Sequence, residues 1–198
     1  MLGVSTADYR RHGAFAEYVA VPAHILYKLP EKVTFNQAAM VEPAAVALHA
    51  VELTPIKLGD TAVVVGAGVI GLFIIQMLKL RGCGQIIAID LQQDRLDLAR
   101  RLGADHTFSP EQVNATEILK LANGRGADIA FEVVGTTAAM QIAIGSVRRG
   151  ATVTLVGNIS DQVDLPLQAV VTQQLRLQGS CAIAGEYAAA LDMIAGGR

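Results

Sequence analysis

Cysteine is scarce in this chain of 198 residues, and long apolar runs are missing. The two cysteines, Cys83 and Cys181, form no C-x-x-C pair and no cluster with metal-ligand spacing. They can build neither a disulfide framework nor a cysteine-rich zinc lobe, so a reducing, cytoplasmic location is expected. The longest apolar run, residues 62–75, is shorter than the roughly 20 residues that cross a bilayer, and it contains glycines. We therefore expect no membrane partner.

A strong charge of either sign is also missing. The 16 lysines and arginines are matched by 18 acidic residues, which gives a net charge of −2. The arginine pairs at 10–11, 100–101 and 148–149 are scattered and lack interleaved aromatic residues, so they indicate solvated surface and no nucleic-acid partner. Charged residues within the first 12 positions leave no apolar core for a signal peptide, which again favours the cytoplasm.

One glycine-rich segment carries most of the functional information. An apolar strand pattern at residues 63–65 enters Gly66-Ala67-Gly68-Val69-Ile70-Gly71, a helix pattern follows, and a second strand pattern at residues 86–89 ends at Asp90. A lone G-x-G-x-x-G is weak evidence in a chain with 19 glycines. The order of strand, glycine turn, helix, strand and acid is that of a dinucleotide site, and this order makes the prediction specific.

Each residue of this pattern has a physical task in such a site. Gly66 allows the tight turn, Gly68 lacks the Cβ that would block a pyrophosphate, and Gly71 lets the helix pack closely on the sheet. The unpaired amides of the first helical turn, which begins at Val69-Ile70, bind the phosphate anion. Asp90, about 20 residues after the glycines, can accept hydrogen bonds from both ribose hydroxyls and would repel a 2′-phosphate. The sequence therefore predicts NAD as the cofactor.

From residue 61 onward, short β-branched runs alternate with helical patterns, as a parallel sheet with crossover helices requires. The predicted strands lie near residues 61–66, 85–90, 105–108, 127–134, 151–157 and 175–182. The predicted helices lie near residues 69–81, 92–102, 111–122, 137–147, 167–174 and 186–195, and glycines close three of them at Gly82, Gly103 and Gly196. We predict an α/β Rossmann fold, a doubly wound parallel sheet of six strands in the order 3-2-1-4-5-6.

Two of the predicted strands end in a valine and a glycine. Val134-Gly135 closes the fourth strand and Val156-Gly157 the fifth. In a doubly wound sheet the ligand crosses the carboxyl ends of the strands at the switch point between the first and fourth, so these residues are predicted beside the cofactor. Simple strand-end turns would have the same sequence, and the pattern does not separate the two interpretations.

Residues 1–54 do not follow the alternation of strands and helices. Residues 13–21 and 25–29 are predicted as strands, although no downstream segment offers them an obvious partner. We therefore divide the chain into residues 1–54 and a nucleotide-binding domain at residues 55–198.

Motifs spread over nearly the whole chain share one resemblance. They are residues 13–19, 27–30, 42–43, 64–71, 95–105 and 156–157. Together they resemble the zinc-dependent medium-chain dehydrogenases/reductases, and most of all the polyol and sugar dehydrogenase branch. The resemblance implies that residues 1–54 are a short remnant of a β-rich, GroES-like catalytic domain. It also implies a parent enzyme that oxidises a secondary alcohol or polyol by hydride transfer to NAD.

The resemblance gives Glu42 a metal role. In the family a cysteine and a His-Glu pair of the catalytic domain hold zinc, and the acid matching Glu42 is a further ligand or holds the zinc-bound water. Residues 42–51 are predicted as a helix with Pro43 at its first position. Without the family, Glu42 would be interpreted as a carboxylate favoured by the helix dipole. His49, two turns along this helix, is expected to be an interior or cofactor-side histidine and not a ligand.

The predicted cofactor-binding residues combine the motif and the resemblance. They are Gly66, Gly68, Val69, Ile70, Gly71, Asp90, Leu91, Arg95, Val134, Gly135, Val156, Gly157 and Cys181. Arg95 is expected to flank the adenosine, with an ordinary surface arginine as the alternative. A catalytic zinc usually needs three protein ligands, and Glu42 offers one, so zinc is expected in the parent and not in this chain.

The chain resembles a fragment, because the family's remaining zinc ligands and its C-terminal return into the catalytic domain are not in it. We expect it to bind NAD without transferring hydride. Animal sorbitol dehydrogenases are similar to this chain, but at the position of Ala182 they carry an arginine beside the substrate. Sorbitol itself is therefore not implied. The expected partners are a small alcohol or polyol and further copies of the chain. The alternatives are a non-enzymatic NAD-sensing module and the zinc-independent quinone reductase branch, which generally lacks the acid at Glu42.

Overall fold

The computed structural model of the protein describes residues 12–112 and 115–197. The chain divides into two compact units, Met1–Glu31 and Lys32–Arg198. In the described part of the first unit, the regular structure is a single turn of 3-10 helix, η1 (Ala23–Ile25). The second unit contains the sheet and all the other helices described below.

The strands predicted at residues 13–21 and 25–29 are wrong. No residue between 12 and 31 is in a strand, and the backbone hydrogen bonds there are local, such as the one from the Ala16 amide to the Ala14 carbonyl. A strand needs a neighbour that accepts and donates along its whole length. The alternation in the sequence indicates which residues could pair, and the described part of this unit contains no second strand.

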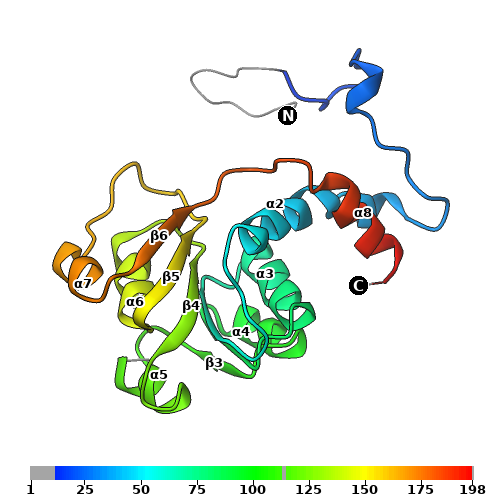
Figure 1. The fold of residues 1–198 in the computed structure, drawn as a ribbon. Helices are drawn as coiled ribbons and strands as arrows, with labels where there is room; N and C mark the ends of the chain where they lie inside the picture. The colour runs from blue at the N-terminus through cyan, green and yellow to red at the C-terminus, as the bar shows by residue number, and fades with distance from the viewer. Residues whose placement is uncertain (1–11, 113–114, 198) are drawn as a thin grey trace. The chain divides into compact units, whose positions relative to one another are not determined.

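The second unit is built on one sheet of six parallel strands, in the order β3-β2-β1-β4-β5-β6 (Figure 1). The strands are β1 (Thr61–Val65), β2 (Gln85–Ile89), β3 (His106–Phe108), β4 (Ala127–Glu132), β5 (Val147–Leu155) and β6 (Arg176–Gly179). The predicted fold class and strand order are confirmed. Val65 is in register with Ile89 on one side and with Glu132 on the other, so the carboxyl ends of these strands meet at one edge.

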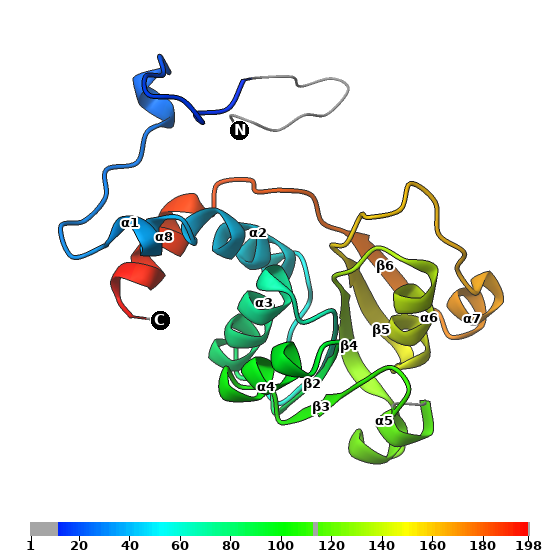
Figure 2. The ribbon, with the colours of Figure 1, turned by 180° about the vertical axis from the view of Figure 1, so that it is seen from behind.

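Helices cover both faces of the sheet, which explains why its central strands are apolar at nearly every position. On one face lie α3 (Val69–Leu80) and α4 (Gln93–Arg101), and on the other lie α5 (Ala115–Leu121), α6 (Thr137–Gly145) and α7 (Leu167–Thr172) (Figures 1 and 2). Val63, Ile87 and Phe131 are fully buried between these layers. Each such side chain contributes roughly 1.5–3 kcal/mol by leaving water.

Three more helices complete the unit: α1 (Phe35–Ala38), α2 (Val41–Glu52) and α8 (Tyr187–Ala195). Helix α2 packs against both α3 and α8. No helix within the described residues is long and apolar enough to cross a membrane.

Two residues predicted at helix ends occupy other positions in the structure. Helix α2 begins at Val41, so Pro43 is its third residue and not its first. Proline is accommodated there because the first amides of a helix have no intrahelical acceptor. Gly196 keeps a right-handed backbone with φ −82°, and the left-handed position falls on Gly197 with φ 72°, whose amide donates to the Ile194 carbonyl.

Candidate functional site: a nucleotide edge on a parallel sheet

The glycine turn after β1 holds α3 tightly against the sheet. Gly66 has φ +101°, and a Cβ there would lie 2.7 Å from the Val134 side chain. A Cβ on Gly71 would overlap the Gly66 carbonyl oxygen and lie 3.0 Å from its carbon. Only glycine at both positions allows the helix to start so close to the end of the strand.

Gly68 differs from Gly66 and Gly71 because the space beside it is open. A Cβ at Gly68 would have no heavy atom within 4 Å, and its φ of −70° suits any residue. Gly68 is the N-cap of α3 and makes no side-chain cap, so the amides of Val69, Ile70 and Gly71 have no partner within the helix. The open space therefore faces unpaired donors at the positive end of a helix of 12 residues, an arrangement that binds anions.

Asp90 is the acid at the end of β2, and its side chain is almost buried, with 8% of the residue exposed. Its Oδ2 accepts from the Ala67 amide at 2.7 Å and its Oδ1 accepts from the Gln92 amide at 2.9 Å. The Arg95 guanidinium lies 3.7 Å from Oδ2. A carboxylate has about four acceptor positions, so Asp90 braces the glycine turn and can still accept from ligand hydroxyls.

A pocket of about 290 Å³ opens beside Asp90. Its walls are Val65, Gly66, Ile89, Asp90, Leu91, Gln92, Arg95, Pro110, Val134, Thr136, Ala138, Ala139 and Ile142. Five of the predicted site residues, namely Gly66, Asp90, Leu91, Arg95 and Val134, thus come together. The sequence prediction missed the opposite wall, formed by the segment after β3 and by α6. Thr136 gave a signal, because its hydroxyl caps α6 by accepting from the Ala139 amide.

The ends of β4 and β5 pack directly on each other. Gly135 has φ +86°, and a Cβ at Gly157 would overlap its amide, so the two backbones touch where any side chain would separate them. The Val156 and Gly157 amides both donate to the Glu132 carbonyl. This arrangement places the predicted Val134-Gly135 and Val156-Gly157 together at the carboxyl edge, next to the glycine turn.

Glu132 is a functional candidate that the sequence prediction missed. The residue is fully buried, and its Oε1 accepts from the Val134 and Gly135 amides at 2.9 and 2.8 Å. Its Oε2 has no hydrogen-bond partner among the described residues. Burial raises the pKa of this carboxyl, although the two amides partly offset the effect. Glu132 therefore holds the backbone of the turn that follows β4 through its bonds to these two amides.

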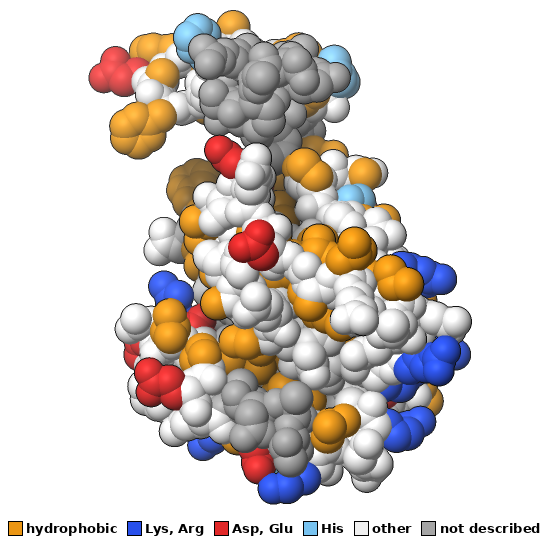
Figure 3. All heavy atoms as spheres, turned by 90° about the vertical axis from the view of Figure 1, so that its left-hand side faces the viewer, with side chains coloured by type: hydrophobic (Ala, Val, Ile, Leu, Met, Phe, Trp, Pro, Cys, Tyr) orange, Lys and Arg blue, Asp and Glu red, His pale blue; other side chains and the backbone are white. Residues whose placement is uncertain are grey.

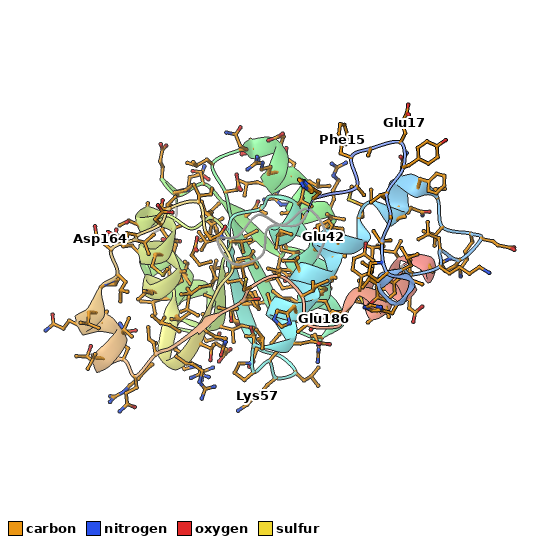
Figure 4. All side chains as sticks on the ribbon, turned by 90° about the horizontal axis from the view of Figure 1, so that it is seen from above. Phe15, Glu17, Glu42, Lys57, Asp164 and Glu186 are labelled. Carbon is orange, nitrogen blue, oxygen red and sulfur yellow. The ribbon has the colours of Figure 1, made fainter. Side chains whose placement is uncertain are left out.

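Cys181 and Glu42 lie apart from the pocket. Cys181 is exposed in the segment that follows β6. Glu42 is exposed in the first turn of α2 (Figure 4). Among the described residues, no group of three or more His, Cys, Asp or Glu side chains is arranged to hold a metal ion. The described donors around Glu42 therefore do not make up a zinc site.

A parallel sheet of this order, with an open helix start after β1 and an acid after β2, has the architecture of a Rossmann fold. The profile of the zinc-binding dehydrogenase family matches residues 69–196, and the chain belongs to that family. The predicted resemblance to the zinc-dependent medium-chain dehydrogenases is thereby confirmed.

Individual relatives agree with the polyol branch of this family. The chain is 32% identical to sorbitol dehydrogenase of Bacillus subtilis over 188 residues, which is 93% of this chain and 53% of the relative. The solved structure of 2R,3R-butanediol dehydrogenase from Bacillus subtilis is similar with a TM-score of 0.85 and 34% identity, over 94% of this chain and 54% of that one. A structure from Sinorhizobium meliloti with NADP bound has a TM-score of 0.85 and 30% identity, over 94% and 56%. The chain thus spans about half the length of the relatives it matches.

Proposed function

We propose that residues 55–198 form an NAD-binding domain, with the dinucleotide crossing the carboxyl edge of the sheet. The observation that carries the proposal is the open space at Gly68, at the start of α3 and one residue after Ala67, whose amide donates to the Asp90 carboxylate. The amides of Val69 to Gly71 would hold the pyrophosphate, and Asp90 would accept from the ribose hydroxyls. The pocket walled by Leu91 and Ile142 would take the adenine.

The same geometry favours NAD over NADP. A 2′-phosphate placed about 4 Å from Asp90 would meet a repulsion of roughly 4 kcal/mol per unit charge at an effective dielectric constant of 20. Arg95 lies 3.7 Å from Asp90 Oδ2 and offsets part of this repulsion. Arg95 and the NADP in the Sinorhizobium meliloti structure support NADP as the second candidate.

Calorimetric titration of the purified chain with each cofactor separates these candidates. We expect NAD to bind at least about tenfold more tightly than NADP, a difference of 1.4 kcal/mol. Asp90→Ser should narrow this ratio, because it removes the negative charge and leaves Arg95 in place. Asp97→Ser, at an exposed site on α4 beyond the pocket, should leave the ratio unchanged. Equal affinities for NAD and NADP in the unmutated chain would remove Asp90 from its assigned role.

We also infer that the parent protein oxidises a secondary alcohol or polyol. The support is the family membership together with the dehydrogenase names of the relatives. When bound in such an enzyme, zinc would lower the pKa of the alcohol and NAD would accept the hydride. The residues of this chain would bind and orient the cofactor. Residues 1–54 are proposed as a remnant of the catalytic domain, with Glu42 completing a zinc site whose other ligands lie outside this chain.

Measurements on the chain alone test its proposed part in this activity. Metal analysis should find no stoichiometric zinc, and NADH absorbance should not rise with a panel of polyols and secondary alcohols, while NAD still binds. The reason is that one carboxylate does not hold zinc tightly, and without zinc the alcohol stays protonated near neutral pH. Stoichiometric zinc together with turnover would contradict this proposal. Failure to bind NAD would contradict the domain assignment itself.

A further inference from the structure

Residues 180–186 join β6 to α8. They lie at the carboxyl edge of the sheet, on the opposite side of the β1–β4 switch point from Asp90. The sheet order places β2 on one side of the β1–β4 switch point and β6 on the other. Because the strands are parallel, residues 180–186 leave β6 at the same carboxyl edge, and Figure 1 shows them running from there to α8 beside α2. A dinucleotide bound at the switch point has one mononucleotide on each half of the sheet.

Residues 180–186 have three features that a simple loop does not require: a fixed start, a buried hydroxyl without a partner among the described residues, and a left-handed backbone position. The Ser180 amide donates to the Leu155 carbonyl at 2.9 Å, which fixes the start of the segment to the end of β5. The Ser180 hydroxyl is buried without a hydrogen-bond partner among the described residues. Ala182 has φ 54°, a left-handed conformation that is uncommon for a residue with a side chain. A strained backbone and an unpaired polar atom together are typical of a ligand-facing segment.

Glu186 anchors the other end of the segment. Its Oε1 lies 2.8 Å from His49 Nδ1, and its Oε2 accepts from the Ala184 amide at 2.6 Å. Both side chains of the pair are largely buried, with 14% of His49 and 10% of Glu186 exposed. Burial opposes ionisation of Glu186, but the bonds from His49 and Ala184 outweigh it and lower the pKa of the carboxyl. Figure 4 shows Glu186 beside α2, which carries His49.

The bond also fixes the state of the imidazole. A carboxylate only accepts hydrogen bonds, so Nδ1 of His49 carries a hydrogen and donates a hydrogen bond to Glu186. Two other charged groups of α2 and α3 have ion-pair partners of their own, since Glu52 lies 3.7 Å from Arg81 and Lys79 lies 3.5 Å from Asp105; Glu42 is exposed in the first turn of α2. Asp192 is on α8 but has no bond to the pair. Glu186 is thus the charged partner of His49 among the described residues.

We propose that His49 and Glu186 are a positioning pair for the nicotinamide half of the cofactor. The pair holds residues 180–186 at the carboxyl edge, so that their backbone and the Ser180 hydroxyl face the nicotinamide ring. This proposal rests on the proposed NAD-binding function. The adenosine half has its own pocket beside Asp90, which shares no residue with this segment. Loss of the pair therefore weakens binding of the nicotinamide half and leaves binding of the adenosine half intact.

Calorimetry with two ligands tests the proposal. NADH contains both halves, whereas ADP-ribose has the adenosine, the pyrophosphate and the second ribose but no nicotinamide. The unmutated chain should bind NADH more tightly than ADP-ribose. His49→Ala and Glu186→Ala should each weaken NADH binding roughly tenfold, because residues 180–186 lose the bond that holds them beside the nicotinamide, and should leave the ADP-ribose affinity within about twofold. The double variant should bind NADH no more weakly than either single variant, because both changes break the same bond.

Two further variants separate positioning from simple loss of folding. His49→Asn keeps an N–H donor near the position of Nδ1 and should restore most of the NADH affinity. Glu52→Ala, on the same helix but away from the segment, should change neither ligand. Equal NADH and ADP-ribose affinities in the unmutated chain, or parallel losses of both ligands in folded variants, would overturn the positioning role. If the unmutated chain binds neither ligand, the proposed NAD-binding function itself fails.

Discussion

Gly68 and Gly71, at the start of α3, give the sharpest prediction, because their substitution should weaken NAD binding in both cases but lower stability only at Gly71. Gly68→Ala should leave the fold intact and weaken NAD. Its backbone suits alanine, and the added methyl would have no heavy atom within 4 Å. Alanine is a poorer N-cap, at a cost of up to about 1 kcal/mol, but restricts the unfolded chain, which gains about 0.4–1 kcal/mol. The melting temperature should therefore stay within about 4 °C of the unmutated value.

The effect on binding is larger, because the methyl of Gly68→Ala would stand where the pyrophosphate approaches the amides of α3. Loss of one charge-assisted hydrogen bond is worth about 1.5–3 kcal/mol, or roughly 10- to 100-fold in affinity. Gly71→Ala should lose both properties, since its Cβ would overlap the Gly66 carbonyl. Overpacking of about 1–3 kcal/mol would lower the melting temperature by roughly 2–12 °C.

Thermal melts followed by circular dichroism and calorimetric titration with NAD measure the two quantities separately. Gly145→Ala is the matched control, because its Cβ also meets open space but lies at the end of α6. It should change neither NAD affinity nor, by more than about 1 kcal/mol, stability. A folded Gly68→Ala chain that binds NAD as tightly as the unmutated chain would refute the placement of the pyrophosphate at this turn.

The remaining predictions concern stability and assembly. Burial opposes ionisation of Asp128, but Arg148 at 2.7 Å and the Thr61 amide at 2.9 Å outweigh it and lower its pKa, so this stabilisation is present at neutral pH and lost below about pH 4. Asp128→Asn should lower the melting temperature at pH 7 by roughly 5 °C and flatten its fall in acid; an unchanged acid limb would contradict the assignment. The pKa of Glu132 is raised, so its ionisation costs stability as pH rises above about 4, and Glu132→Gln should melt at pH 7 no lower than the unmutated chain. We also expect self-association through the free edge of β6, where Val163-Asp164-Leu165 could extend the sheet across a twofold axis. Apolar side chains are exposed on the face that includes α7 (Figure 3), among them Leu167 and Val171, and light scattering that finds only monomer at high micromolar concentration would count against this.

The predictable part of the fold is the part specified by local chemistry. The turn at Gly66 to Gly71 has glycine where left-handed φ or close packing requires it, and the acid follows at the end of the next strand. The strand order could be predicted because right-handed crossovers leave few arrangements for alternating strands and helices. The strands expected at residues 13–21 and 25–29 failed for the converse reason. Alternation reports which face of a segment would be buried, but the partner strand must come from elsewhere.

The candidate site shows the same division. The wall of the pocket next to Asp90 was predictable, because its residues follow the motif directly along the chain. The opposite wall comes from Pro110 and α6; a helix was predicted near residues 137–147, but its sequence did not indicate that it lines the pocket. His49 and Glu186 are 137 residues apart, and no local pattern relates a histidine in one helix to the residue that precedes another. Contacts of this kind depend on tertiary packing, which a single sequence does not display.

The contact between α2 and α8 has a consequence for how this unit can be rearranged. Ala44, near the start of α2, and Ile194, near the end of α8, line the same small hollow, so the polypeptide enters and leaves the nucleotide-binding unit at neighbouring points. A domain whose two ends lie close together can be inserted into a surface loop of a host protein without distorting the host fold. The same proximity would let a short linker join its ends while new termini open at an exposed turn. The unit is therefore suited to insertion into a surface loop of another protein.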